Sequence, residues 1–268
     1  MAASIEMEGT EFAVRETDLK GLLGRTLLRA EKPYAGLRFQ LVGRLSAPLP
    51  APRVAIVGTT EPSGEGLEFT AKLVENLVRE RATVVSGLVK GIGTATLKVA
   101  LDRGGTAVAV LVPSAGALQP EAVGLQSELM REQVVVSPLD LTVSEEGLTI
   151  LEGAVALLSE VLVVAEAGES EPVHAVREAV RLGRKVFVSG LVERKGPSWF
   201  REIREEYDVE VLNSPDRVDE VLDPDNFIAN PEMRRFLKAQ RLAYQSVQAV
   251  KTSPAEGMWR EAKRMLKV

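Results

Sequence analysis

Glycine, serine and threonine residues gather in two loops, each directly after a short apolar segment. The first loop covers 58–66 and reads Gly-Thr-Thr-Glu-Pro-Ser-Gly-Glu-Gly, and the second covers 86–94 and contains a cation, Lys90. Glycine lets a backbone approach closely, and clustered backbone N–H groups beside a cation bind phosphate oxygens. We therefore predict phosphate or nucleic-acid binding by Gly58, Thr59, Thr60, Ser63, Ser86, Gly87, Lys90 and Gly91.

Neither loop has the complete spacing of a known phosphate motif. No Gly-Lys-Ser/Thr closes either loop as in a P-loop, and G-x-G-x-x-G is incomplete in both. Glycine is also the ordinary residue of tight turns, so each loop alone fits a purely structural turn equally well. Two such loops at one edge of one sheet favour a phosphate-bearing ligand.

A third loop, 166–171, is rich in carboxylates and reads Glu-Ala-Gly-Glu-Ser-Glu. Carboxylates repel phosphate, although one at the end of a strand can accept hydrogen bonds from a ribose. We interpret Glu169 and Glu171 as solvated loop residues. The predicted binding set is extended by Glu166, Gly168 and Ser170.

The composition excludes several kinds of site. The chain has 268 residues, no cysteine and one histidine, His174, so it can form neither a disulfide framework nor the usual Cys/His zinc site. A Ser-His-Asp triad would have to use His174, and no nucleophile turn lies near it in the sequence. We expect no metal, no cofactor and no enzymatic activity.

Seven short, mostly apolar segments position these loops. They lack period-two alternation, which is typical of strands buried on both faces of a parallel sheet. Leu67, Ala71, Val74 and Leu77 share one helical face, and a second helix ends before Gly183. The pattern predicts an α/β fold, a doubly wound, mainly parallel Rossmann-like sheet with helices on both faces. The predicted strands are 54–57, 83–86, 106–112, 133–137, 161–165, 185–188 and 209–212.

The chain divides into three predicted parts. Residues 1–50 form a leader with a proline-rich end, 51–223 form the Rossmann-like domain, and 224–268 form a basic amphipathic helical tail. The net charge is −5, whereas 231–268 carry nine Lys/Arg against three Glu. Such an asymmetry marks either a polyanion-binding element or an ordinary solvated helix face. The auxiliary basic surface would consist of Arg234, Arg235, Lys238 and Arg241.

Neither a secretory signal nor a membrane span is recognisable in the sequence. The N-terminus is acidic, and the longest apolar runs fall far short of the roughly 20 residues that a bilayer span requires. We expect a cytoplasmic protein without a membrane partner.

The order of the loops resembles the DprA/Smf family of DNA-processing proteins. The segments that carry the resemblance are 54–66, 84–92, 108–111, 162–168 and 183–187. Residues 37–43 are similar to the leader strand of that family, and the resemblance covers roughly residues 37–190. The Pro-Gly-Gly-x-Gly-Thr motif of the related LOG phosphoribohydrolases is missing.

The resemblance implies an extended Rossmann fold, a homodimer, and phosphate contacts to single-stranded DNA in a basic pocket. It also implies delivery of the strand to a recombinase in DNA uptake or repair, without covalent chemistry. Thr59-Thr60 stands where the family has Ser-Arg, and Leu151-Glu152-Gly153 stands where it has Arg-Asn-Arg. Each lost charge-assisted contact weakens binding by about 1–3 kcal/mol, so we expect this inner pocket to bind DNA poorly.

Two alternatives stay open. In the first, the lost arginines narrow the ligand to a nucleotide-derived small molecule in the Rossmann pocket, and the protein is a sensor or binding domain. In the second, the chain is a non-catalytic structural paralogue whose dimer or tail contacts another protein.

Overall fold

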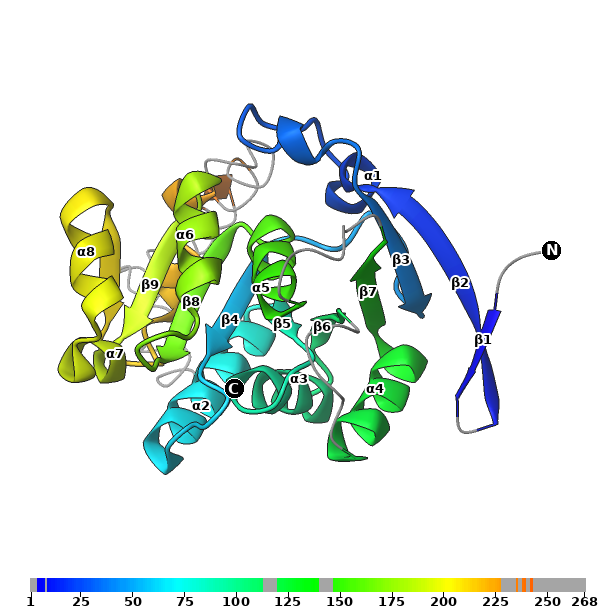
Figure 1. Cartoon of the computed structure of the whole chain (residues 1–268), viewed down its shortest axis with the longest axis horizontal. Helices are drawn as coiled ribbons and strands as arrows, with labels where there is room; N and C mark the ends of the chain where they lie inside the picture. The colour runs from blue at the N-terminus through cyan, green and yellow to red at the C-terminus, as the bar shows by residue number, and fades with distance from the viewer. Residues whose placement is uncertain are drawn as a thin grey trace, which may run out of the picture.

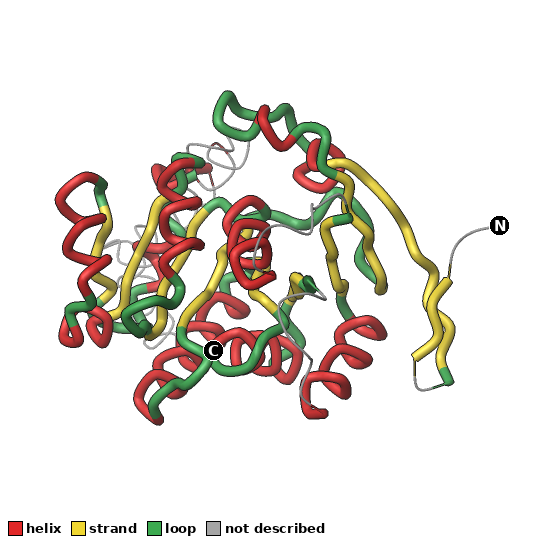
Figure 2. Tube along the Cα trace, viewed as in Figure 1, coloured by secondary structure: helices red, strands yellow, loops and turns green. Residues whose placement is uncertain are grey.

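A ten-stranded sheet forms the centre of the molecule (Figures 1 and 2). The computed structural model describes residues 4–7, 9–112, 120–139 and 147–227, together with positions 235, 238, 239 and 242. In spatial order the strands are β1-β2-β3-β7-β6-β5-β4-β8-β9-β10. The predicted α/β class is confirmed.

Seven neighbouring strands run parallel, and they are the seven that the apolar segments predict. Their side chains are largely buried, and in β8 all six residues are buried. Hydrophobic surface on both faces of these strands explains why their sequences do not alternate. The parallel strands are β4 (Arg53–Gly58), β5 (Thr83–Gly87), β6 (Thr106–Val110), β7 (Val134–Pro138), β8 (Val161–Glu166), β9 (Lys185–Ser189) and β10 (Val209–Leu212).

The first fifty residues add three antiparallel strands to the same sheet. They are β1 (Ser4–Met7), β2 (Thr10–Asp18) and β3 (Arg38–Gly43), and β3 pairs with β7. The strand that the resemblance places at 37–43 is therefore β3. A short helix, α1 (Leu19–Leu23), and a 3-10 turn, η1 (Lys32–Tyr34), connect β2 to β3.

Helices cover both faces of the sheet, as predicted (Figure 1). One face packs against α1, α5 (Gly147–Leu157), α6 (Val173–Arg181), α7 (Gly190–Lys195) and α8 (Ser198–Glu206). The helices of the opposite face are α2 (Gly64–Arg79), α3 (Ile92–Asp102), α4 (Pro120–Glu132) and α9 (Val218–Val221), and the 3-10 turn η3 (Pro224–Asn226) follows α9. The helical face predicted from Leu67 to Leu77 is part of α2, and Leu73, Val74 and Leu77 are buried there.

The order of the strands reverses between β4 and β8. From β4 the chain proceeds through β5 and β6 to β7 on one side, and then returns to β8 on the other side of β4. At the carboxyl end of this pair, Gly58 lies opposite Glu166 across a register shift. Ligands of doubly wound sheets bind beyond such ends, so a ligand site is expected at this switch point.

A buried ion cluster attaches the leader to the parallel strands. The Glu31 carboxylate lies 2.6 Å from both Arg25 and Arg184, and the side chains of Glu31 and Arg184 are fully buried. Burial alone would raise the pKa of Glu31, but the two guanidinium groups outweigh it and hold the pKa at about 2. Residues 1–50 are therefore joined to the 51–223 unit by packing, by strand pairing and by charge.

Little of the predicted tail is described. Positions 235, 238, 239 and 242 are helical and exposed, whereas Arg234 and Arg241 lie outside the described residues. Within the described ranges, no helix combines the length and the hydrophobicity that crossing a membrane requires.

Candidate functional site

Main-chain hydrogen bonds join three loops at the switch point. The N–H of Thr59 donates to the carbonyl of Glu166 at 2.9 Å, and the N–H of Ile92 donates to the carbonyl of Thr59 at 3.1 Å. The β4–α2, β5–α3 and β8–α6 loops consequently lie at the same edge of the sheet. This juxtaposition confirms that the two glycine-containing loops share one edge.

Close packing of these loops requires two of the predicted glycines. Gly91 has φ +92°, and a Cβ there would lie 2.4 Å from the carbonyl oxygen of Thr59. A Cβ at Gly58 would lie 2.6 Å from the carbonyl oxygen of Glu166. Only glycine fits at such distances. The packing of the loops therefore explains glycine at both positions without a ligand.

The donors of Thr59 and Thr60 converge on a carboxylate of the chain itself. Glu171 Oε2 accepts the backbone N–H of Thr60 at 2.9 Å, the Thr60 hydroxyl at 3.1 Å and the Thr59 hydroxyl at 3.4 Å. The interpretation of Glu171 as a solvated loop residue is therefore wrong. Because β4 and β8 are neighbours, the loop after β8 turns this side chain onto the loop after β4.

A second carboxylate occupies the start of α2. Glu166 Oε2 accepts the N–H of Ser63 at 2.8 Å and its hydroxyl at 3.1 Å, while Glu166 Oε1 pairs with Lys195. The Ser63 hydroxyl also caps the helix by accepting the N–H of Gly66. Burial alone would raise the pKa of Glu166, but Lys195 and the two Ser63 donors outweigh burial and lower it.

A third carboxylate caps α6. Glu152 on α5 is buried, and its Oε2 accepts the backbone N–H of Ala175 at 2.9 Å. Burial, with a further contribution from the negative charge of Glu171, raises the pKa of Glu152 to about 7. Glu152 thus places an acid where the resemblance puts the middle of the family's Arg-Asn-Arg segment.

Two of these three carboxylates, Glu152 and Glu171, line a small inner crevice. The cavity left between Gly58, Gly87, Glu152 and Glu171 has a volume of about 30 Å³. A cavity of that size has room for water and is far smaller than an ordinary ligand site. In this conformation the crevice accommodates water-sized groups, and its acids oppose the entry of phosphate.

The remaining predicted residues have other surroundings. Ser86 is buried and donates its hydroxyl to the carbonyl of Ile56 at 2.6 Å, which ties β5 to β4. A Cβ at Gly87 would lie 2.4 Å from the Leu151 side chain. The carbonyl of Gly168 accepts the indole N–H of Trp199 at 3.0 Å, and Ser170 is exposed on the same loop.

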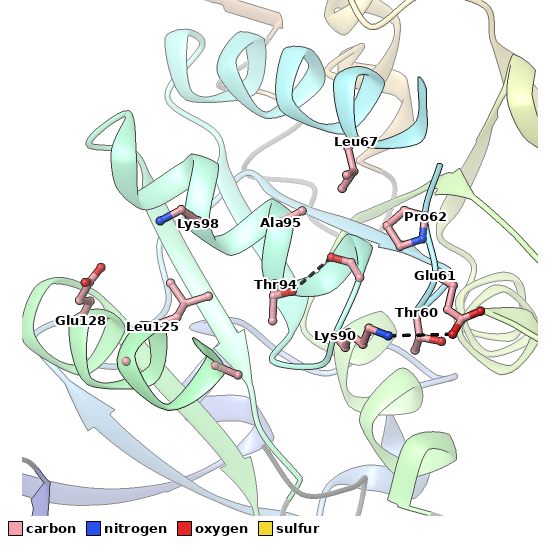
Figure 3. A pocket seen from close by; sticks show the side chains of 13 residues that line it. Thr60, Glu61, Pro62, Leu67, Lys90, Thr94, Ala95, Lys98, Leu125 and Glu128 are labelled. Atoms are coloured by element: carbon pink, nitrogen blue, oxygen red, sulfur yellow. Dashed lines mark hydrogen bonds and ion pairs between the residues drawn. The ribbon is translucent and has the colours of Figure 1, made fainter. Parts of the chain in front are cut away.

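A much larger groove lies on the other side of the β4–α2 loop (Figure 3). Its volume is about 1060 Å³, and Thr60 borders both the groove and the inner cavity. Lys90 is exposed at one end and lies 3.9 Å from Glu61, and a second lysine, Lys98, enters from α3. The other lining residues are Pro62, Leu67, Gly91, Thr94, Ala95, Ala122, Gly124, Leu125 and Glu128.

Sequence reasoning places Lys90 but misses most of this groove. Lys98 and Leu125 come from the interiors of α3 and α4, and neither follows a strand end. Lys98 is an exposed helix position like those of most surface lysines, and Leu125 is a buried apolar helix position like those of most core leucines. Neither residue type nor its position marks a groove in the sequence.

The predicted auxiliary basic surface is represented by two described residues. Arg235 is exposed, and Lys238 pairs with Asp225 at 2.9 Å. Among the described residues, no group of His, Asp or Glu has an arrangement that could hold a metal ion.

Known proteins resemble this chain in sequence and in fold. The family model for DNA recombination-mediator protein A matches residues 40–201. A curated relative, the DNA processing protein DprA of Streptococcus pneumoniae, is 42% identical over 60 residues. That match spans 22% of this chain and 21% of the relative.

Two solved structures share the fold. DNA processing protein A from Streptococcus pneumoniae has a TM-score of 0.62 and 24% identity, covering 78% of this chain and 74% of that one. The Helicobacter pylori protein, whose structure concerns its single-stranded DNA binding mode, has a TM-score of 0.61 and 18% identity, covering 80% and 97%. The family model spans the strands and loops that build the switch point, and on that match the chain belongs to the DNA recombination-mediator protein A (DprA/Smf) family.

Proposed function

We propose that this chain is a DNA-processing protein that binds single-stranded DNA in the groove between the β4–α2 loop, α3 and α4. The observation that carries the proposal is the groove itself, with its apolar floor and two exposed lysines. Family membership supports the ligand class, and so does the single-stranded DNA binding mode of the Helicobacter pylori relative.

The chemistry of the groove suits an unpaired strand. Leu67, which is 41% exposed, offers apolar surface to base faces that no complementary strand covers, and the largely buried Leu125 lies in the groove wall. Lys90 and Lys98 provide the positive charge that phosphate neutralisation requires. Two carboxylates, Glu61 and Glu128, line the same groove, so a bound phosphate competes with Glu61 for Lys90. Such binding depends strongly on salt and little on base sequence.

The inner crevice is a poorer place for the strand. Its volume is about 30 Å³, and Glu152 and Glu171 face it. This agrees with the expectation that the position of the family's arginines binds DNA poorly here. The proposal therefore assigns phosphate contacts to Lys90 on the groove side, rather than to the donors that Glu171 and Glu166 already engage.

The wider role follows the family resemblance. In this proposal the protein is a cytoplasmic homodimer that makes no covalent change to the strand. It passes the strand to a recombinase in DNA uptake or repair.

An anisotropy titration with a fluorescent single-stranded oligonucleotide tests the proposal. At low salt we expect a Kd in the micromolar range or tighter, with a steep loss of affinity as salt rises. Equal affinity at low and at high salt, or no binding at low salt, would contradict the proposal.

A nucleotide-derived small molecule is the second candidate ligand. The groove volume of about 1060 Å³ favours it, since ordinary small-molecule sites measure roughly 300–1,000 Å³. A thermal-shift screen of nucleotides separates the two, because a ligand at a hundred times its Kd stabilises the fold by about 2.7 kcal/mol. A structural paralogue would respond to neither assay.

A further inference from the structure

Glu171 lies on the inner side of Thr60, the residue that borders both hollows of this site. Its carboxylate lines the inner cavity, while Thr60, which it holds, borders both the cavity and the outer groove. Glu171 thus accepts hydrogen bonds from Thr60, the residue that separates the cavity from the groove. Moving Glu171 would free the donors of Thr60 for another acceptor.

The hydrogen-bond donors around the Glu171 carboxylate suit an anion. One backbone N–H and two hydroxyl groups converge on Oε2 within 3.4 Å, and Thr60 Oγ1 also lies 3.3 Å from Oε1. A phosphate oxygen would use the same donors, because clustered N–H and hydroxyl donors recognise negatively charged oxygen from either source. The chain's own carboxylate therefore competes with an external phosphate for one place.

We infer that Glu171 determines the anion specificity of this site, because its carboxylate fills the Thr59 and Thr60 donors and confines the phosphates of a bound strand to the outer groove. The inference rests on the proposed function for its ligand. It predicts a gain of binding on removing an acid, the opposite of what a merely structural contact would produce.

Two substitutions test the residue in different ways. Glu171→Gln removes the charge and keeps the shape, and Glu171→Ala also opens the space beside Thr60. The matched control is Glu169→Ala, which removes one negative charge from the same loop. Glu169 is exposed and accepts from Ser198 at 3.1 Å, on the side of α8 rather than of Thr60.

Each variant is compared with the native chain by oligonucleotide anisotropy and by thermal shift in inorganic pyrophosphate. We expect Glu171→Ala and Glu171→Gln to bind the oligonucleotide about tenfold more tightly than the native chain. That gain is equivalent to about 1.4 kcal/mol. Pyrophosphate should raise the Tm of both variants, and Glu169→Ala should stay within about twofold of the native affinity.

A third variant locates the gain. Thr60→Val combined with Glu171→Ala removes the Thr60 hydroxyl but keeps its backbone N–H and the Thr59 hydroxyl, so it should lose part of the pyrophosphate response. If Glu171→Ala does not fold, Glu171→Gln decides, since the isosteric amide keeps the packing of the loop.

The outcomes separate this inference from the proposed function. Native binding of the oligonucleotide with no gain in either Glu171 variant would overturn the inference and leave the function standing. No native binding, with a gain of pyrophosphate binding in the variants, would do the reverse. An equal gain in Glu169→Ala would also overturn the inference, because overall charge would then explain the effect.

Discussion

The carboxylate of Glu152 on α5 accepts the backbone N–H of Ala175, in the first turn of α6, at 2.9 Å. The contact joins two helices on one face of the sheet and caps the second of them. Burial and then the charge of Glu171 raise the pKa of Glu152 to about 7, so this cap titrates near neutral pH.

The first prediction concerns the pH dependence of stability. The folded pKa of Glu152 exceeds its ordinary value of 4.5, so its stabilising effect is complete below pH 4.5 and is lost as pH rises through 7. The shift corresponds to about 3 kcal/mol. Between pH 5 and pH 8, urea denaturation should show the native chain losing more stability than Glu152→Gln. Parallel pH profiles for the two proteins would contradict this assignment.

The second prediction concerns the buried ion cluster. Glu31→Gln leaves Arg184 buried without its negative partner, which should cost about 3–5 kcal/mol of unfolding free energy. Glu16→Gln is the matched control, since its pair with Arg38 is half exposed and should change stability by less than about 1 kcal/mol. Denaturant melts of both variants measure the difference, and equal losses would refute a structural role for Glu31.

The lowered pKa of Glu31 in the folded chain makes the stability of this cluster depend on acid. Its folded pKa is about 2, below the value of 4.5 expected for an unfolded chain. The stabilisation is therefore present above pH 4.5 and is lost as pH falls toward 2. Below pH 4, the stability of Glu31→Gln should fall less steeply than that of the native chain.

The third prediction concerns the contact between two loops. Gly91→Ala places a Cβ 2.4 Å from the carbonyl oxygen of Thr59 at φ +92°, so it should destabilise the fold by about 1–3 kcal/mol. Gly124→Ala in α4 meets nothing within 4 Å and should stabilise the helix by about 0.5–1 kcal/mol. If the two alanine variants melt alike, the packing of the β5–α3 loop is not what selects glycine.

Much of the fold follows from local sequence. The parallel strands are visible because segments such as 161–165 are apolar without alternation, and β8 occupies 161–166. Strand β2 is not visible in this way, because only Phe12 and Val14 of its nine residues are buried. A strand with one face exposed has few apolar residues, so its sequence predicts a strand less clearly than that of a central, fully buried strand.

The site shows where local reasoning ends. Thr60 follows a strand end and is found from that position alone. Glu171 accepts its hydrogen bond from a residue 111 positions earlier, and no spacing rule links the two. Its role depends on the neighbouring positions of β4 and β8, which the order of elements along the chain does not by itself establish.

Strand binding in the outer groove is the central claim, and removal of its two lysines tests it most directly. The measurement is oligonucleotide anisotropy across a range of salt for Lys90→Ala combined with Lys98→Ala, beside Lys72→Ala. Lys72 is an exposed lysine on α2 that pairs with Asp216 and does not line the groove. We predict about tenfold weaker binding for the double variant, with a log–log salt slope reduced by about 1.4, and native behaviour for Lys72→Ala. Unchanged affinity and slope in the double variant would contradict the account.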